Sequence, residues 1–152
     1  MATHEFQTRL EWSGSTAGDY REYSRSHTAA NPPARAELRL SSAPEYVGDA
    51  GLLNPEQLLV TAASSCHMLS FLALANRKKI DVRAYQDDAL GEMPSDEKPV
   101  RISRITLRPV ITVAPGSDHA LVVELAHRAH DVCFIANSLN SEVRVEPKVL
   151  EA

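Results

Sequence analysis

Segments of the first forty residues alternate between apolar and polar positions. Residues 5–12 follow this alternation and predict a half-buried β-strand. Residues 13–19 form a cluster of turn-forming residues, after which residues 20–28 are expected to pair back as a hairpin. A further alternating segment at residues 36–40 predicts a third strand, so the chain begins with a sheet.

A long apolar stretch from Leu58 to Ala75 follows and predicts a helix. Asn54 is suited to cap this helix, Pro55 to occupy its first position, and Gln57 to complete a capping box. Apolar residues occupy nearly all sides of the helix, which is typical of a central helix buried on every side. The cations at residues 77–79 favour its end there.

The second half of the chain mixes strands and helices. Strands are expected at residues 80–84, along 102–113 and at 143–149, with a helix at 118–132 and a short helical piece at 133–139. Strands and helices do not alternate strictly. We therefore expect an α+β fold in one domain, residues 1–152, with an antiparallel sheet around the long buried helix.

Composition and charge narrow the class of protein. The chain has 152 residues and a net charge of −4, which argues against a nucleic-acid partner. We identify no apolar run long enough to span a bilayer and no secretory signal, so we expect no membrane partner and a cytoplasmic location. Thiols are kept reduced there, so the two cysteines are either buried bystanders or redox groups.

Cys66 lies within the predicted central helix. A free cysteine in an apolar helix is commonly a small core residue. Ser64 and Ser65 interrupt the apolar run, however, and could cap a new helix beginning at Cys66, whose dipole would lower the pKa of the thiol. His67 is expected at a pocket or interface, because adjacent helical residues point in different directions.

Cys133 comes directly after the second predicted helix. It too can be a buried structural residue, and its spacing does not say whether it meets Cys66. A disulfide between them would need Cα atoms within about 7 Å. His127 and His130, three residues apart on a helix, offer a weak alternative as metal ligands. We favour solvated or capping roles for them and expect neither a metal nor a cofactor.

Three charged residues are further candidates. A carboxylate at Glu56 suits the first turn of a helix without any functional role. About 15 Å of helix separates Glu56 from Cys66, so an arginine from another strand would have to link the two. Arg21 and Arg25, in the predicted second strand, are available for this. Ordinary surface charge is the alternative interpretation for both.

Two motifs resemble the OsmC/Ohr family of proteins. The first is Leu53-Asn54-Pro55-Glu56-Gln57-Leu58-Leu59, followed by Ala63-Ser64-Ser65-Cys66, and the second is Val132-Cys133-Phe134-Ile135-Ala136-Asn137-Ser138. The resemblance covers most of the chain. It departs from the family pattern at Phe134, where proline is common, and at His67. The chain therefore resembles a divergent, OsmC-like branch of the family.

The resemblance implies an intertwined α+β homodimer that reduces organic hydroperoxides. Cys66 would attack and become a sulfenic acid, Cys133 would condense with it, and a dithiol such as a dihydrolipoyl protein would reduce the disulfide. Glu56 would hold the activating arginine, with Arg25 favoured over Arg21. The expected walls of an apolar pocket are Met68, Leu69, Phe71, Leu72, Phe134 and Ile135. The alternative function is a non-enzymatic stress or ligand-binding protein on the same fold.

Overall fold

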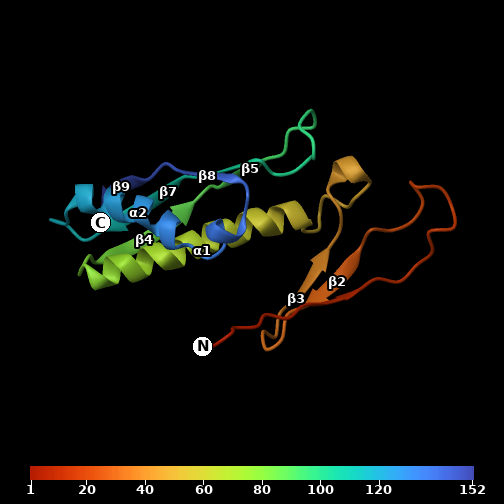
Figure 1. Ribbon diagram of the computed structural model, residues 1–152, viewed down its shortest axis with the longest axis horizontal. Coiled ribbons are helices and arrows are strands. Elements are labelled where there is room, and N and C mark those ends of the chain that lie inside the picture. Colours follow the sequence, from red (N-terminus) through yellow and green to blue (C-terminus); the bar gives the residue numbers. More distant parts are fainter. The chain divides into compact units, whose positions relative to one another are not determined.

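A computed structural model describes residues 1–152, which form two units, Met1–Leu58 and Leu59–Ala152. The elements of both units are shown in Figure 1. We describe each unit by itself. The predicted single domain over residues 1–152 stays a prediction.

The first unit contains a three-stranded antiparallel sheet. Its strands are β1 (Arg9–Glu11), β2 (His27–Ala30) and β3 (Glu37–Leu40), in the order β1-β2-β3. The predicted hairpin is confirmed, since β1 pairs antiparallel with β2. Both predicted strands are shorter than expected. Leu10 and Trp12 are exposed within this unit, so β1 is not half-buried there.

The start of the long helix follows the prediction. A short 3₁₀ helix, η1 (Pro44–Tyr46), precedes α1 (Pro55–Arg77). The side chain of Asn54 accepts a hydrogen bond from Gln57 N at 2.8 Å, and the side chain of Gln57 accepts one from Asn54 N at 3.1 Å. These two bonds form the predicted capping box and satisfy N–H groups that a helix end otherwise leaves unpaired.

The second unit contains two three-stranded sheets and the second helix. One sheet has the order β4 (Val82–Asp87), β7 (Pro109–Val113), β9 (Lys148–Glu151). The other has the order β5 (Leu90–Glu92), β6 (Arg104–Leu107), β8 (Glu142–Val145). Helix α2 (His119–Val132) is capped by Asp118 as predicted, and a 3₁₀ turn, η2 (Ala136–Ser138), follows it.

Two predicted strands are each divided between the two sheets. The expected strand at 102–113 breaks at Arg108, whose N–H donates to the Asp87 carboxylate at 2.6 Å instead of to a neighbouring strand. The expected strand at 143–149 likewise breaks at Pro147, which has no N–H to donate. β6–β8 and β7–β9 pair in parallel, so these sheets are mixed and not purely antiparallel.

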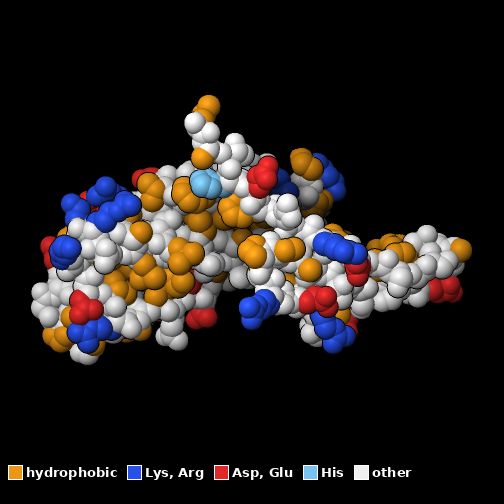
Figure 2. All heavy atoms as spheres, turned by 90° about the horizontal axis from the view of Figure 1, so that it is seen from below, with side chains coloured by type: hydrophobic (Ala, Val, Ile, Leu, Met, Phe, Trp, Pro, Cys, Tyr) orange, Lys and Arg blue, Asp and Glu red, His pale blue; other side chains and the backbone are white.

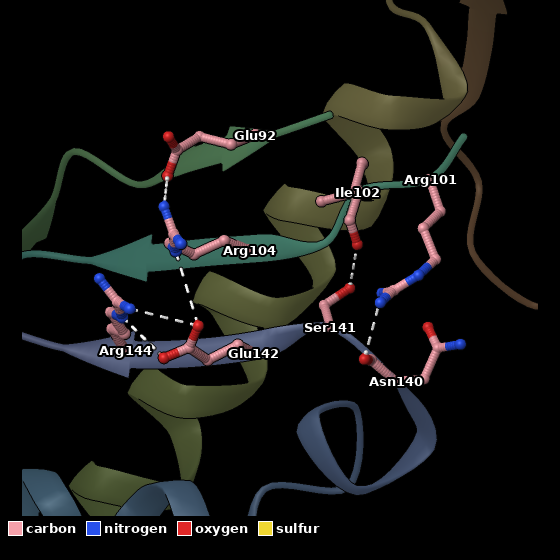
Figure 3. Close-up of polar contacts among 8 residues, drawn as sticks. All are labelled: Glu92, Arg101, Ile102, Arg104, Asn140, Ser141, Glu142 and Arg144. Carbon is pink, nitrogen blue, oxygen red and sulfur yellow. Dashed lines mark hydrogen bonds and ion pairs between the residues drawn. The ribbon is translucent and has the colours of Figure 1, made fainter. Parts of the chain in front are cut away.

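Charged side chains lie across the β5-β6-β8 sheet (Figure 3). Arg104 on β6 lies 3.4 Å from Glu92 on β5 and 3.6 Å from Glu142 on β8. Arg144 pairs with the same Glu142 at 2.8 Å. All these side chains are well exposed, so each pair contributes roughly 1 kcal/mol or less to stability. The strand pairing brings these charged side chains together, and the apolar core supplies most of the stability.

The core of the second unit forms on a single stripe of α1. Ala63, His67, Phe71 and Ala75 recur every four residues and are the only residues of α1 that are buried. The larger of two apolar clusters contains Phe71, Ala75, Ile111, Val113, Val122, Leu125, Ala126 and Ala129. The expectation that α1 is buried on every side is therefore wrong for the single chain.

α1 is also long and apolar enough to cross a membrane by length and composition. The sequence prediction that no such run exists is therefore wrong. The core helix of a soluble protein passes the same test, and the stripe of α1 described above packs against β7 and α2. This packing fits a core helix and does not imply insertion into a membrane.

Candidate functional site

The two cysteines come together in the second unit. Cys66 lies in the middle of α1 and is half-buried, whereas Cys133 directly follows α2 and is 1% exposed. The two thiols lie close enough to shift each other's pKa, and both are free. The tertiary structure thus brings together two sulfur atoms that lie sixty-seven residues apart in the sequence.

Cys66 does not begin a new helix. α1 is continuous through this region, and Ser64 donates its hydroxyl hydrogen bond to Asp87 on β4 at 2.5 Å. The predicted effect of a helix N-terminus on the thiol is therefore wrong, because the dipole acts mainly within the first turn of a helix.

Donors from the segment after α2 act on Cys66 instead. Burial raises the pKa of the Cys66 thiol, but hydrogen bonds from Ile135 N–H, the Cys133 thiol, Phe134 N–H and the Ser70 hydroxyl together lower it below its ordinary value. Burial raises the pKa of Cys133, and its contact with Cys66 adds to this. The pair is therefore asymmetric, with the thiolate favoured at Cys66 and the proton at Cys133.

A pocket of about 430 Å³ opens beside Cys66. It is lined by Cys66, Leu69, Ser70, Ala73, Leu74, Arg77, Val132 and Phe134. Three of its apolar side chains are exposed, with Leu69 60%, Val132 50% and Phe134 82% accessible. Exposed hydrophobic side chains also show on the face seen in Figure 2. An apolar pocket that reaches a thiol can admit an apolar substrate to the sulfur.

The predicted pocket walls are confirmed in part. Leu69 and Phe134 line the pocket as expected. Phe71 belongs to the core, while Leu72 and Ile135 pack against the two core clusters. Met68 lines a different pocket, beside Tyr85 and Asp87. The sequence prediction missed the directions in which Met68, Phe71 and Leu72 leave α1.

Ser70 and Arg77 also belong to the pocket but were not singled out from the sequence. Ser70 lies one turn after Cys66, and Arg77 lies eleven residues after it, close to three full turns. Both spacings place these side chains on the Cys66 face of α1. Arg77 was assigned only to the cationic end of the helix. It adds the one charged side chain among the lining residues.

The three predicted charged residues lie in the first unit. Arg21 and Arg25 lie in the loop before β2 and not in a strand. The guanidinium of Arg25 stacks on Tyr23 at 3.7 Å and on Tyr20 at 4.5 Å, and it donates hydrogen bonds to the carbonyls of both residues. Glu56 is half-buried in the first turn of α1. Their role in activating Cys66 stays a prediction.

The predicted histidine positions are confirmed only in part. His67 is 1% exposed and belongs to the core, so the expectation that it lies at a pocket or interface is wrong. His127 is exposed on α2, and His130 is half-buried. No three His, Cys, Asp or Glu side chains come together in an arrangement that could hold a metal ion.

The lowered pKa of Cys66 predicts a pH profile for alkylation. Iodoacetamide reacts with the thiolate, so the midpoint for Cys66 should lie below the free-cysteine value of about 8.5. Cys133→Ala removes one donor and should move this midpoint upward. The rate of Cys66 modification against pH, followed by mass spectrometry, measures both. A wild-type midpoint at or above the free value would contradict the hydrogen-bonding arrangement.

Comparison with known families gives one match. The family model described as OsmC-like protein matches residues 48–148. That range includes Glu56, both cysteines and every residue that lines the Cys66 pocket.

Similar proteins cover nearly the whole chain. A solved OsmC-like protein of unknown function from Vibrio cholerae is 28% identical, with 95% of this chain and 99% of that one covered and a TM-score of 0.86. An organic hydroperoxide resistance protein OsmC from Legionella pneumophila is 19% identical, with 98% of each chain covered and a TM-score of 0.66. The uncharacterized protein YmaD of Bacillus subtilis is 22% identical, with 96% of this chain and 93% of its own length covered.

Proposed function

Because this chain belongs to the OsmC family of proteins, we propose that it is a thiol-dependent peroxidase that reduces organic hydroperoxides. The main support is the asymmetry of the cysteine pair. Cys66 is half-buried, lines a pocket and has a lowered pKa, while Cys133 is buried, has a raised pKa and contacts Cys66. Such a pair suits an attacking thiolate with a resolving thiol beside it.

The proposed reaction begins at the Cys66 thiolate. The sulfur attacks the terminal oxygen of R–O–OH, so that an S–O bond forms as the O–O bond breaks. The alkoxide that leaves takes up a proton and becomes the alcohol ROH. Cys66 is oxidised to a sulfenic acid, and the hydroperoxide is reduced.

Cys133 then resolves the sulfenic acid. Its sulfur displaces hydroxide from Cys66–SOH, its thiol proton converts the hydroxide to water, and a Cys66–Cys133 disulfide forms. An external dithiol, of which dihydrolipoyl groups are one example, reduces the disulfide by exchange and is itself oxidised. A reducing compartment such as the cytoplasm would supply this dithiol.

The pocket indicates the kind of hydroperoxide. Leu69, Ala73, Leu74, Val132 and Phe134 line it, and burying an apolar group against them yields about 25 cal/mol per Å². Hydrogen peroxide has no apolar group to bury. We therefore propose that bulky alkyl or aryl hydroperoxides react faster than hydrogen peroxide.

Glu56 and an arginine are proposed to assist Cys66. The support is the family resemblance at the Asn54-Pro55-Glu56 motif, within the range that the family model matches. Arg25 is the favoured arginine, because two tyrosine rings and two carbonyl groups hold its guanidinium in place. Arg21 has no comparable contact for its side chain.

A homodimer is also proposed. α1 is apolar nearly all round, yet this chain buries only one stripe of it and leaves Leu69 60% exposed. Large apolar surfaces of this kind are commonly covered by a partner. A second copy of the chain would cover them, and sedimentation equilibrium of the purified protein measures whether the particle has the mass of two chains.

The same pocket would also suit a non-enzymatic protein that binds a small apolar ligand. Both proposed functions depend on the apolar lining of the pocket, and the reactivity of the thiols distinguishes the peroxidase from the binding protein. A binding protein has no need of a reactive thiolate beside a second thiol.

The peroxidase proposal is tested by adding one equivalent of cumene hydroperoxide to the reduced protein. We expect both thiols to disappear after the addition and the mass of the protein to decrease by about 2 Da as the disulfide forms. Addition of a dithiol should then restore both thiols. The peptide map should join Cys66 to Cys133. If both thiols persist after this addition, and also after a further excess of hydroperoxide, the result would favour the binding protein instead.

A further inference from the structure

His67 is the residue directly after Cys66, but its side chain points elsewhere. Successive residues of an α-helix are separated by about 100° around the axis. Cys66 faces the pocket, while His67 faces the core with 1% of its surface exposed. His67 therefore does not meet a substrate in that pocket.

Both ring nitrogens of His67 have partners from other elements. Nε2 lies 2.8 Å from the Ala126 carbonyl oxygen on α2, and Nδ1 lies 3.0 Å from the Tyr85 hydroxyl on β4. A carbonyl oxygen only accepts, so Nε2 must carry the proton. Nδ1 is then the acceptor, and Tyr85 donates to it. The partners thus define one neutral tautomer.

The charged and titratable groups around the ring favour this neutral form. Burial lowers the pKa of His67, while the hydrogen bond to Ala126 and the nearby Asp87 on β4 raise it by less. His127 and His130 on α2 lower it further. The ring consequently stays uncharged at neutral pH and can keep both hydrogen bonds.

The contact with Ala126 joins the two helices that carry the reactive sulfurs. α1 carries Cys66, and α2 ends at Val132, directly before Cys133, which lies seven residues or about 10 Å beyond Ala126. The segment after Cys133 also supplies the Phe134 and Ile135 N–H groups that stabilise the Cys66 thiolate. Any shift of α2 along α1 would therefore move Cys133 and these donors together.

Apolar side chains of α1 and α2 also share one core cluster. Phe71 and Ala75 pack with Val122, Leu125 and Ala129. Apolar packing is not directional, whereas a hydrogen bond loses strength steeply when its length or angle changes. The His67–Ala126 bond is thus well suited to fix the position of one helix along the other.

We propose that His67 is a positioning residue, which holds α1 and α2 in the register that keeps Cys66 beside Cys133 and the N–H groups of Phe134 and Ile135. This inference rests on the proposed function for its purpose, but it concerns the redox pair itself. Disulfide formation depends on narrow geometry, with Cα atoms about 4.4–6.8 Å apart. A displacement of about 1 Å at such a site can cost 10²-fold in rate.

Two matched substitutions test the proposal. The amide of His67→Gln reaches the position of Nε2 and can donate to Ala126, whereas the shorter amide of His67→Asn reaches only the position of Nδ1, near Tyr85. Phe71→Leu, one turn along the same buried stripe, loosens the packing without touching that hydrogen bond. All three variants lose stability, so stability alone does not separate them.

The measurement is the equilibrium between the Cys66–Cys133 pair and glutathione, which needs no hydroperoxide. We expect His67→Asn to lower the equilibrium constant for the disulfide at least tenfold, about 30 mV in potential, and to raise the alkylation midpoint of Cys66. His67→Gln should stay within about threefold of the wild type, as should Phe71→Leu. If the Asn and Gln variants shift equally, or Phe71→Leu shifts as far as His67→Asn, the proposal is overturned.

Wild-type protein gives a check that does not depend on folding of any variant. Imidazole ¹⁵N spectra should show the Nε2–H tautomer of His67 in both the reduced and the oxidised protein. A Nδ1–H tautomer would mean that Ala126 is not bonded and would also overturn the proposal. A different result would count against the proposed function alone. In that case the wild-type protein would show no peroxidase activity, while the His67 variants would still shift the glutathione equilibrium as expected.

Discussion

Cys66→Ser is expected to abolish the consumption of cumene hydroperoxide in the presence of a dithiol. A serine hydroxyl in this position does not ionise near neutral pH, so the hydrogen bonds from Ile135, Phe134 and Cys133 have no thiolate to stabilise. We expect kcat/KM to fall on the order of 10³-fold or more, as when another enzyme loses its nucleophile. Consumption of hydroperoxide over time, with and without protein, measures the change.

Cys133→Ser is the matched control, because it leaves the attacking sulfur in place. This variant should still reduce one equivalent of hydroperoxide and then accumulate a sulfenic acid at Cys66, which dimedone traps. The loss should therefore be of turnover, with the first step retained. Unchanged turnover in the Cys66→Ser variant would remove Cys66 from the mechanism.

Phe71→Ala is expected to cost about 3–5 kcal/mol of unfolding free energy, the usual range for truncating a fully buried phenylalanine. Its ring is 0% exposed and packs with Ile111 and Val113 on β7 and with Leu125 on α2. Neighbouring rigid elements limit how far the core can collapse into the cavity. Since a domain of this kind is stable by only about 5–15 kcal/mol, the midpoint of urea denaturation should fall sharply.

Leu69→Ala on the same helix serves as the comparison. Leu69 is 60% exposed and belongs to neither core cluster, so within a single chain its truncation should change stability by about 0.5 kcal/mol or less. Equal losses in the two variants would show that the solution structure also buries the Leu69 side of α1. A loss of less than about 1 kcal/mol for Phe71→Ala would contradict the core described above.

Acid should weaken the folded protein through His67. The pKa of the buried ring lies below the unfolded value of 6.5, so the unfolded chain binds a proton that the native state does not. The contribution of His67 to the free energy of unfolding is complete above pH 6.5. Below that pH it falls as the pH decreases, by at most about 1.4 kcal/mol per pH unit. This change of stability with pH has the opposite sign to that expected for a histidine whose pKa is raised by an anionic partner.

Some features of this protein follow from neighbouring residues alone. Asn54, Pro55 and Gln57 determine where α1 begins, because a capping box involves only residues three apart. Asp118 determines the start of α2 in the same way. The two cysteine motifs also indicated the family, because their residue types and spacing are visible without a fold.

Other features depend on contacts between segments remote in sequence. The meeting of Cys66 with Cys133, the burial of His67 and the division of the strand at Arg108 each require partners on other elements, such as Ala126 and Asp87. The lowered pKa of Cys66 likewise comes mainly from groups beyond α2, the N–H groups of Ile135 and Phe134 and the thiol of Cys133, with Ser70 as the one contributor from α1. Local patterns determine where helices begin and which residues are present, whereas packing determines which side chains meet, because one helix offers several faces.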